Sequence, residues 1–111
     1  MSRKRTQTSN PYAITVLFEV VPASHREFLN LVKDNAKKSV SLEPECYRFD
    51  VLMPIAQGAG AQVFLYEVYR DRAAFDAHLA SAHFQSFDQA TKHMVMQKTV
   101  LDYVVDVNRK A

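Results

Sequence analysis

Three polar side chains occupy positions where the surrounding pattern is apolar, and they are the first candidates for chemistry. Asn35 follows Val32 by three residues and Phe28 by seven, which puts an amide on the apolar stripe of a predicted helix. Glu67 shares one side of a predicted strand with apolar side chains, where an unpaired carboxylate would be costly. His83 lies at a predicted break between two helices, where an imidazole can exchange protons near neutral pH.

Each of these residues also has a purely structural interpretation, and the sequence leaves both open. Asn35 either ties its helix to a neighbouring loop or points into a cavity between helices and sheet. Glu67 either forms a salt bridge, with Arg48 on the neighbouring strand or with a partner subunit, or has a raised pKa and acts as a general acid or base. His83 either caps a helix end or shuttles protons.

The motifs of the common catalytic sites are absent from the sequence. There is no Walker loop, no GxSxG and no HExxH, and the four histidines (His25, His78, His83 and His93) lack metal-ligand spacing, so no metal site is expected. His78 and His83 would lie on different sides of a continuous helix unless the chain breaks at Ser81–Ala82. Cys46 is the single cysteine and is interpreted as a small buried hydrophobic residue rather than a nucleophile.

Apolar periodicity predicts the elements that must position these residues. Alternating patterns predict four strands, at Tyr12–Val21, Cys46–Met53, Gln62–Arg70 and Thr99–Val107. Helical spacing predicts three helices: one opened by a Ser24–Glu27 capping box and running to about Leu42, one capped by Asp71 and ending near Leu79, and one over Phe84–Met96. On the first helix Phe28, Leu29, Val32, Ala36 and Val40 should face the core, and on the second strand Tyr47, Phe49, Val51 and Met53 should share a side.

The order of these elements predicts an α+β, ferredoxin-like fold, in which a four-stranded antiparallel sheet carries its helices on one face. Apolar side chains occur on both sides of the first and third strands. Because the helices can cover only one face, the other needs a partner, and we expect an obligate homodimer packed sheet to sheet.

Length and charge exclude several classes of protein. The 111 residues suffice for one domain, expected over 12–111 after a flexible N-terminal arm over 1–11. The 14 basic and 12 acidic residues include Arg3, Lys4 and Arg5 of the arm, so the rest has no concentrated basic face for nucleic acid. No apolar run approaches the roughly 20 residues that span a bilayer, and no signal peptide precedes the domain, so we expect a cytoplasmic protein.

Three segments resemble the antibiotic biosynthesis monooxygenase family, which includes quinol monooxygenases and the isomerase that degrades autoinducer-2. These segments are EPECYRFD, RFDVLMP at Arg48–Pro54 and FLYEVYRDRAAFDAHLASAHFQSF at Phe64–Phe87, and the resemblance extends over about Tyr12–Val107. It implies a dimeric ferredoxin-like domain that oxidises phenols or quinols with O₂ and uses neither metal nor flavin.

The resemblance also implies site residues. Asn35, Glu67, His78 and His83 match polar positions of the family's pocket, with Phe49 and Tyr66 as its walls. Apart from the resemblance, Arg48 is expected near the lip of the pocket as a substrate-binding cation. The chain departs from the family pattern in having Glu45 where glycine is usual before the second strand, and in having no tryptophan.

Three functions follow as hypotheses. In the first, a cofactor-independent monooxygenase uses His83, or Glu67 through it, to take a proton from a small phenol or quinol, and Asn35 holds the oxyanion. In the second, an isomerase acts on a phosphorylated linear dione, for which Lys37, Lys38 and Arg48 are the candidate anchors. In the third, the protein is a non-catalytic dimeric binding module whose interior is filled by side chains.

Overall fold

The computed structural model of the chain describes residues 10–56 and 60–106. Within these ranges the chain forms four strands and three α-helices, with two short 3₁₀ turns at Pro22–Ser24 and Lys92–Met94. The elements in chain order are β1 (Tyr12–Val20), α1 (His25–Leu42), β2 (Cys46–Leu52), β3 (Gln62–Tyr69), α2 (Arg72–Leu79), α3 (Ala82–Thr91) and β4 (Val95–Val104). Residues 1–9 of the expected N-terminal arm, and Gly58 of the loop after β2, lie outside the described residues.

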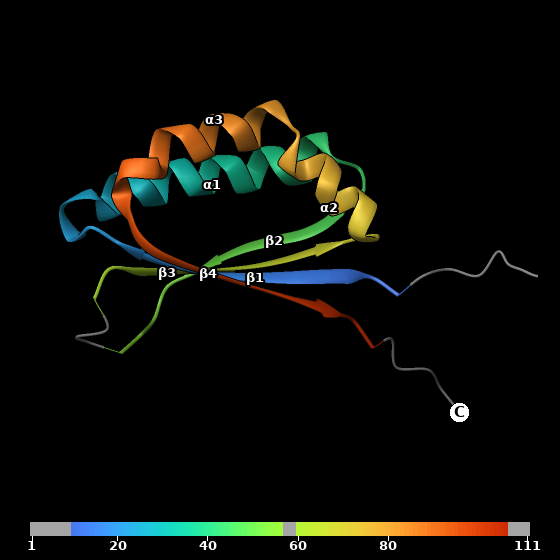
Figure 1. Cartoon of the computed structure of the whole chain (residues 1–111), viewed down its shortest axis with the longest axis horizontal. Helices are drawn as coiled ribbons and strands as arrows, with labels where there is room; N and C mark the ends of the chain where they lie inside the picture. The colour runs from blue at the N-terminus through green and yellow to red at the C-terminus, as the bar shows by residue number, and fades with distance from the viewer. Residues whose placement is uncertain (1–9, 57–59, 107–111) are drawn as a thin grey trace, which may run out of the picture.

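The sheet is antiparallel throughout and has the order β2-β3-β1-β4. All three helices lie on one face of it (Figure 1). The predicted ferredoxin-like α+β fold is therefore confirmed. Its register places Glu67 of β3 opposite Ile14 of β1, and Lys98 of β4 opposite Phe18 of β1, all on the face that the helices cover.

The core lies between that face and the helices. Phe28 and Val32 of α1 are completely buried. The Phe28 ring lies 4.9 Å from the Phe18 ring of β1 and 5.8 Å from the Phe87 ring of α3, both in edge-to-face geometry. Such aromatic pairs add to the free energy gained by removing apolar area from water, and they join the three elements that surround the candidate site. Val40, which was expected to face the core, is 48% exposed near the end of α1.

The boundaries of the third helix and the last strand differ from the prediction over Phe84–Met96 and Thr99–Val107. The helix begins earlier because Ser81 is its N-cap, with the hydroxyl oxygen accepting a hydrogen bond from the Phe84 N–H at 3.2 Å. β4 begins earlier because its pairing with β1 already starts at Val95, opposite Val20. Pairing across the sheet therefore overrides the local helical pattern, which continues to Met96.

The capping box at Ser24 is also wrong. Ser24 belongs to a 3₁₀ turn, its backbone is in the right-handed helical region (φ −97°, ψ 0°), and its side chain makes no capping hydrogen bond. A capping residue ordinarily needs an extended backbone, which Ser24 lacks. The predicted cap of α2 is confirmed, because an Asp71 carboxylate oxygen accepts from the Ala74 N–H at 2.9 Å.

A register shift changes the sides of β2. Pairing moves from Cys46 opposite Tyr69 to Arg48 opposite Val68, which leaves Tyr47 as an extra residue. Such a bulge puts both residues that flank it out of strict alternation. Cys46 is therefore buried on the helical side together with Phe49, whereas Tyr47 is 54% exposed, contrary to the predicted side-sharing.

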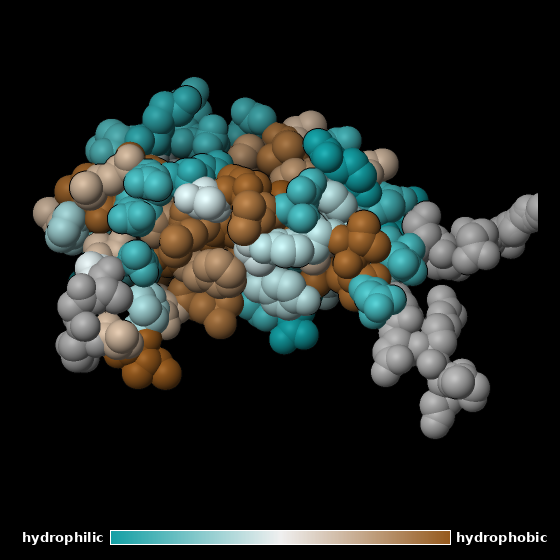
Figure 2. Space-filling model, turned by 60° about the horizontal axis from the view of Figure 1, so that its bottom comes forward, coloured by the Kyte–Doolittle hydropathy of each residue, from teal (hydrophilic) through white to brown (hydrophobic). Residues whose placement is uncertain are grey.

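The opposite face of the sheet has no helix over it (Figure 1). Hydrophobic side chains gather on this face (Figure 2), and those more than 45% exposed include Leu52, Leu101 and Tyr103. Phe64, Tyr66 and Leu17 contribute half-buried apolar area to the same face. Among the described residues, no helix is both long and apolar enough to cross a membrane.

Candidate active site

A cavity of about 240 Å³ lies between the helices and the sheet. Its wall is mainly apolar and aromatic, with side chains that include Val16, Phe18, Phe49, Leu65, Phe84 and Phe87. An engineered apolar cavity of about 150 Å³ binds benzene, so this one has room for a substituted or larger ring. The binding-module hypothesis required an interior filled by side chains, and this cavity contradicts that requirement.

Four polar side chains interrupt the apolar wall: Asn35, Glu67, His78 and Lys98. The fold brings them from four elements, since the inner side of α1 carries Asn35, β3 carries Glu67, α2 carries His78 and β4 carries Lys98. Three of the four, Asn35, Glu67 and His78, are at most 3% exposed. Sequence reasoning identified those three but missed Lys98, because it started the last strand at Thr99, whereas β4 begins at Val95.

The Asn35 amide lacks a partner for its oxygen. Its Oδ1 atom is buried and accepts no hydrogen bond from the described part of the chain, although the Asn35 main-chain oxygen accepts one from the Ser39 hydroxyl at 2.7 Å. A buried acceptor without a donor costs about 1–3 kcal/mol. Because Asn35 lines the cavity, its Oδ1 atom can accept a hydrogen bond from a molecule bound there.

Glu67 accepts a hydrogen bond from the Tyr69 hydroxyl at 2.7 Å. Burial raises the pKa of the Glu67 carboxyl to about 7, although the hydrogen bond from Tyr69 acts in the opposite direction. The predicted salt bridge with Arg48 is wrong, because Arg48 pairs with Asp50 at 2.7 Å. A carboxyl that changes charge near neutral pH inside an apolar cavity can act as a general acid or base.

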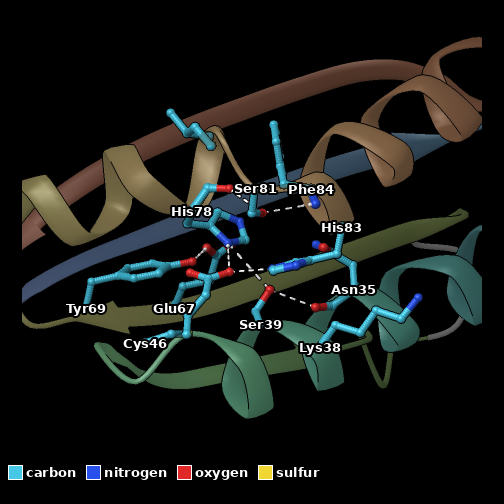
Figure 3. A network of polar contacts seen from close by, with 12 residues as sticks. Asn35, Lys38, Ser39, Cys46, Glu67, Tyr69, His78, Ser81, His83 and Phe84 are labelled. Atoms are coloured by element: carbon cyan, nitrogen blue, oxygen red, sulfur yellow. Dashed lines mark hydrogen bonds and ion pairs between the residues drawn. The ribbon is translucent and has the colours of Figure 1, made fainter.

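His78 and His83 meet at one carboxylate that sequence reasoning missed. His78 Nδ1 lies 2.9 Å, and His83 Nε2 2.5 Å, from the same Glu43 Oε2 atom. The predicted break at Ser81–Ala82 makes this possible, since α2 ends at Leu79 and α3 begins at Ala82, and the two imidazole rings lie 5.9 Å apart (Figure 3). Burial lowers the pKa of His78, and the hydrogen bond that its Nδ1–H donates to the Glu43 carboxylate offsets part of that effect.

The histidines lack metal-ligand spacing in the sequence, but two of them come together with a carboxylate in the fold. In the fold, the donor atoms of Glu43, His78 and His83 all lie within 4.8 Å of one another. Glu43 follows the last residue of α1 and lies 35 positions from His78. Because a single acidic residue before a proline is not a recognisable motif, nothing in the sequence marked it.

Two expected site residues lie elsewhere. Arg48 and Tyr66 face the uncovered side of the sheet, where the Arg48 guanidinium carbon lies 5.6 Å from the Tyr66 ring centroid. Because of the β2 bulge and the alternation along β3, they lie on the other face of the sheet from Phe49 and Glu67. Tyr66 is therefore not a wall of this cavity, and Arg48 is not at its lip.

His83 and the expected phosphate anchors also stand apart from the cavity. The wall formed by the described residues includes His78 but not His83, which reaches the cavity only through Glu43 and His78. Lys37 and Lys38 are exposed on the outer side of α1, and Lys38 pairs with Asp34 at 3.0 Å. The cation at the cavity is instead Lys98, whose ammonium lies 5.6 Å from the Phe18 ring centroid.

Cys46 is 4% exposed, and burial raises the pKa of its thiol to about 11. A thiol with that pKa stays protonated at neutral pH and is a poor nucleophile. Its interpretation as a small buried hydrophobic residue agrees with this environment.

The raised pKa of Glu67 predicts that the contribution of this carboxyl to folding stability falls as pH rises. The folded carboxyl has a pKa of about 7, against an ordinary value of 4.5, so the native state holds this proton more tightly than the unfolded chain does. The contribution of Glu67 to stability is fully present below pH 4.5, and about 3 kcal/mol of it is lost as pH rises to 7. Glu67→Gln should abolish this dependence. Urea unfolding measures this effect. Between pH 5 and pH 8 the free energy of unfolding of Glu67→Gln should increase relative to that of the wild type. If the two free energies change in parallel, the raised pKa of Glu67 is wrong.

The family model for antibiotic biosynthesis monooxygenase matches residues 11–90. The chain belongs to this family. No curated protein matches the sequence. The fold of the family is also found in solved structures that are similar to this chain at low sequence identity.

Two of these structures are provisionally named antibiotic biosynthesis monooxygenases. The protein from Bacteroides thetaiotaomicron has 22% identity and a TM-score of 0.80, and the match covers 88% of this chain and 91% of that one. The protein from Caulobacter crescentus has 17% identity and a TM-score of 0.82, with 90% and 93% covered. At such identities the likeness establishes the fold alone.

Proposed function

We propose that this protein is a cofactor-independent monooxygenase that oxidises a small phenol or quinol with O₂. The observation that carries the proposal is the apolar cavity into which Asn35 and Glu67 bring an unpaired amide oxygen and a carboxyl of pKa about 7. Aromatic walls suit a planar ring, and convergent polar groups can orient its hydroxyls. Membership of the antibiotic biosynthesis monooxygenase family supports the same class of reaction.

A quinol can supply all the electrons that this reaction needs. Oxidation of the quinol to a quinone releases two electrons, and hydroxylation of one ring carbon releases two more, which together reduce O₂. One oxygen atom forms a C–O bond with the ring and the other leaves as water, so quinol and O₂ give hydroxyquinone and water. No external reductant is required.

Glu67 and Asn35 have distinct roles in this scheme. The ionised Glu67 carboxylate takes the proton from a quinol hydroxyl, since a base with a pKa near the working pH is the most effective. The electron-rich quinolate then transfers an electron to O₂, and the two radicals combine at a ring carbon to form a hydroperoxide that loses water. The Asn35 Oδ1 atom accepts a hydrogen bond from a substrate hydroxyl, and its N–H group donates to the phenolate oxygen.

The apolar wall also contributes to the chemistry. In a cavity that excludes water, hydrogen bonds to the phenolate are stronger, and the reactive intermediates are protected from quenching. Phe49 and His78 lie in this wall, where we propose that they pack against the bound ring. His83, expected as the base, acts only through Glu43 in this arrangement.

Oxygen uptake by chelator-treated, metal-free protein tests this function directly. Mono- and bicyclic quinols should be consumed with one equivalent of O₂ each, and ¹⁸O₂ should label the hydroxyquinone with a single oxygen atom. Formation of hydrogen peroxide with an unlabelled quinone would show oxidase chemistry instead. Lack of uptake with every quinol would refute the proposal.

The alternative isomerase on a phosphorylated dione has less support. Its expected anchors lie outside the cavity, and Lys98 is the one cation among the described residues that line it. A phosphate group carries up to two negative charges and ordinarily binds several donors. A neutral or singly charged ring fits this wall better than a phosphorylated chain does.

We also propose that two copies pack through the uncovered face of the sheet. Its support is the exposed apolar area of Leu52, Leu101 and Tyr103, next to half-buried side chains of β1 and β3. An exposed apolar patch of this kind is typical of an interface between subunits. Helices cover only the other face (Figure 1), so the proposed dimer leaves each cavity within its own subunit.

The dimer is tested by placing a charge on that face. Wild-type protein should have twice the chain mass of 12.7 kDa in light scattering, and Leu101→Lys should shift it to the monomer mass, because burying an unpaired ammonium is costly. Gln89→Lys, on the exposed side of α3, is the matched control and should remain dimeric. A wild-type protein of 12.7 kDa at micromolar concentration would exclude the interface.

A further inference from the structure

We propose that Glu43, His78 and His83 form a binding site for one divalent transition-metal ion of the Zn²⁺ or Co²⁺ class. The site joins the end of α1 to α2 and α3 beside the cavity, and it plays no part in the proton transfer assigned to Glu67. The inference goes beyond the proposed oxygenase and does not depend on it.

The geometry is close to that of a bound ion. Both ring nitrogens already point at one carboxylate oxygen, at 2.9 Å for His78 Nδ1 and 2.5 Å for His83 Nε2 (Figure 3). Zinc lies about 2.0–2.2 Å from nitrogen and oxygen ligands, which places tetrahedral donors about 3.4 Å apart. The two contacts would therefore have to widen by less than about 1 Å, which small side-chain rotations can supply.

The donor set selects the class of metal. Two imidazoles and one carboxylate suit zinc, cobalt, nickel, copper and ferrous ions, whereas calcium and magnesium require mainly oxygen ligands. Three protein ligands also leave a fourth tetrahedral position for water, which is the arrangement of an open site rather than a closed structural one. Coordination through Nδ1 would place the His78 ring proton on Nε2.

Burial and charge favour the same conclusion. The side chains of His78, His83 and Glu43 are 2%, 8% and 15% exposed, so the ligands are held by packing rather than by solvent-facing loops. When both imidazoles are neutral, the Glu43 carboxylate is the one charged group of the cluster, and its side chain is mostly shielded from water. A divalent ion would give the Glu43 carboxylate a positive charge in direct contact, where the free protein offers it only two neutral imidazoles. Because the three side chains are already held in place, they lose little conformational entropy when the ion binds.

Calorimetry and thermal unfolding of untagged, chelator-treated full-length protein test the site with Zn²⁺ and Co²⁺ as probes. We expect one equivalent to bind with micromolar or lower Kd, and the Tm to rise by at least about 5 °C at a hundredfold excess over Kd. Co²⁺ should give visible absorption typical of a four-coordinate site. Zinc X-ray absorption of the wild-type complex should show two imidazoles, and their absence would refute the assignment without any variant.

Matched variants assign the ligands. Glu43→Gln and His83→Gln should each weaken binding at least about tenfold. Glu45→Gln, at a half-buried position two residues after Glu43, and His93→Gln, at an exposed position in the turn after α3, should not. Glu43→Gln keeps an oxygen that can accept from both imidazoles, so it should fold, and circular dichroism will verify this. Equal affinity in the four variants, or no saturable binding by the wild type, would overturn the site. Oxygen uptake by metal-free protein is measured separately, so either proposal can fail alone.

Discussion

Glu67→Gln is expected to lower the rate of quinol-dependent oxygen uptake by about 10²–10⁴-fold, the usual effect of losing a general base. The amide is nearly the same size and can still accept the hydrogen bond that Tyr69 donates at 2.7 Å, so the cavity should keep its shape. It cannot take a proton from the substrate. The loss should therefore appear in kcat rather than in the Kd of an unreactive quinone.

The pH profile separates a base from a merely structural carboxyl. With a pKa of about 7, Glu67 is ionised above neutrality, so wild-type kcat/KM should rise through pH 7 and then level off. The residual activity of Glu67→Gln should lack this step. Glu19→Gln, a half-buried residue outside the cavity wall, is the control and should keep the wild-type profile. Activity of Glu67→Gln within twofold of the wild type would eliminate Glu67 as the base.

The second large effect is expected for Asn35→Ala, with a decrease of about 10²–10³-fold in kcat. The amide oxygen is buried without a donor in the free protein, so it incurs a cost that a substrate hydroxyl would relieve. In the proposed reaction its N–H group donates a hydrogen bond to the phenolate and so stabilises the developing negative charge. Stopped-flow oxidation of a quinol under saturating O₂ measures this step.

Stability distinguishes the functional amide from a structural one. Removing an unsatisfied buried acceptor should leave the free energy of unfolding unchanged or slightly increased, while activity is lost. Asn30→Ala, at an exposed position of the same helix, should affect neither property. If Asn35→Ala instead unfolds readily and keeps its turnover, the amide is structural and the assignment of the oxyanion contact is wrong.

The opposite trends in activity and stability expected at Glu67 have one physical cause. Burial in an apolar cavity disfavours the carboxylate, which both costs stability above neutral pH and makes the group a base matched to a weak acid such as a quinol. The same environment therefore accounts for both the proposed role of Glu67 as a base and the cost of this carboxylate to stability. A salt bridge to Arg48, had it formed, would have favoured the carboxylate and lowered its pKa.

Local patterns were sufficient to predict the fold because each depends on a short stretch of chain. Alternation located β1 and β3, and it placed Glu67 on the inner side of its strand; helical spacing placed Asn35 on the buried stripe of α1. Asp71 was predicted as a cap from its position alone. The prediction failed where pairing or backbone geometry competes with the local pattern, as at the β2 bulge and at the beginning of β4.

The amino-acid sequence by itself determined the order of strands and helices, the placement of the helices on one face of the sheet, and the inward position of Asn35 and Glu67. It could do so because the spacing of apolar residues within a short segment determines which side of that segment is buried. Tertiary structure alone decided that Glu43 joins His78 and His83, that Lys98 reaches the cavity, and that Arg48 and Tyr66 face away from it. These outcomes depend on strand register and on where chain segments far apart in sequence meet. No periodicity within one segment encodes such contacts, since a one-residue shift in pairing reverses the side on which every side chain points.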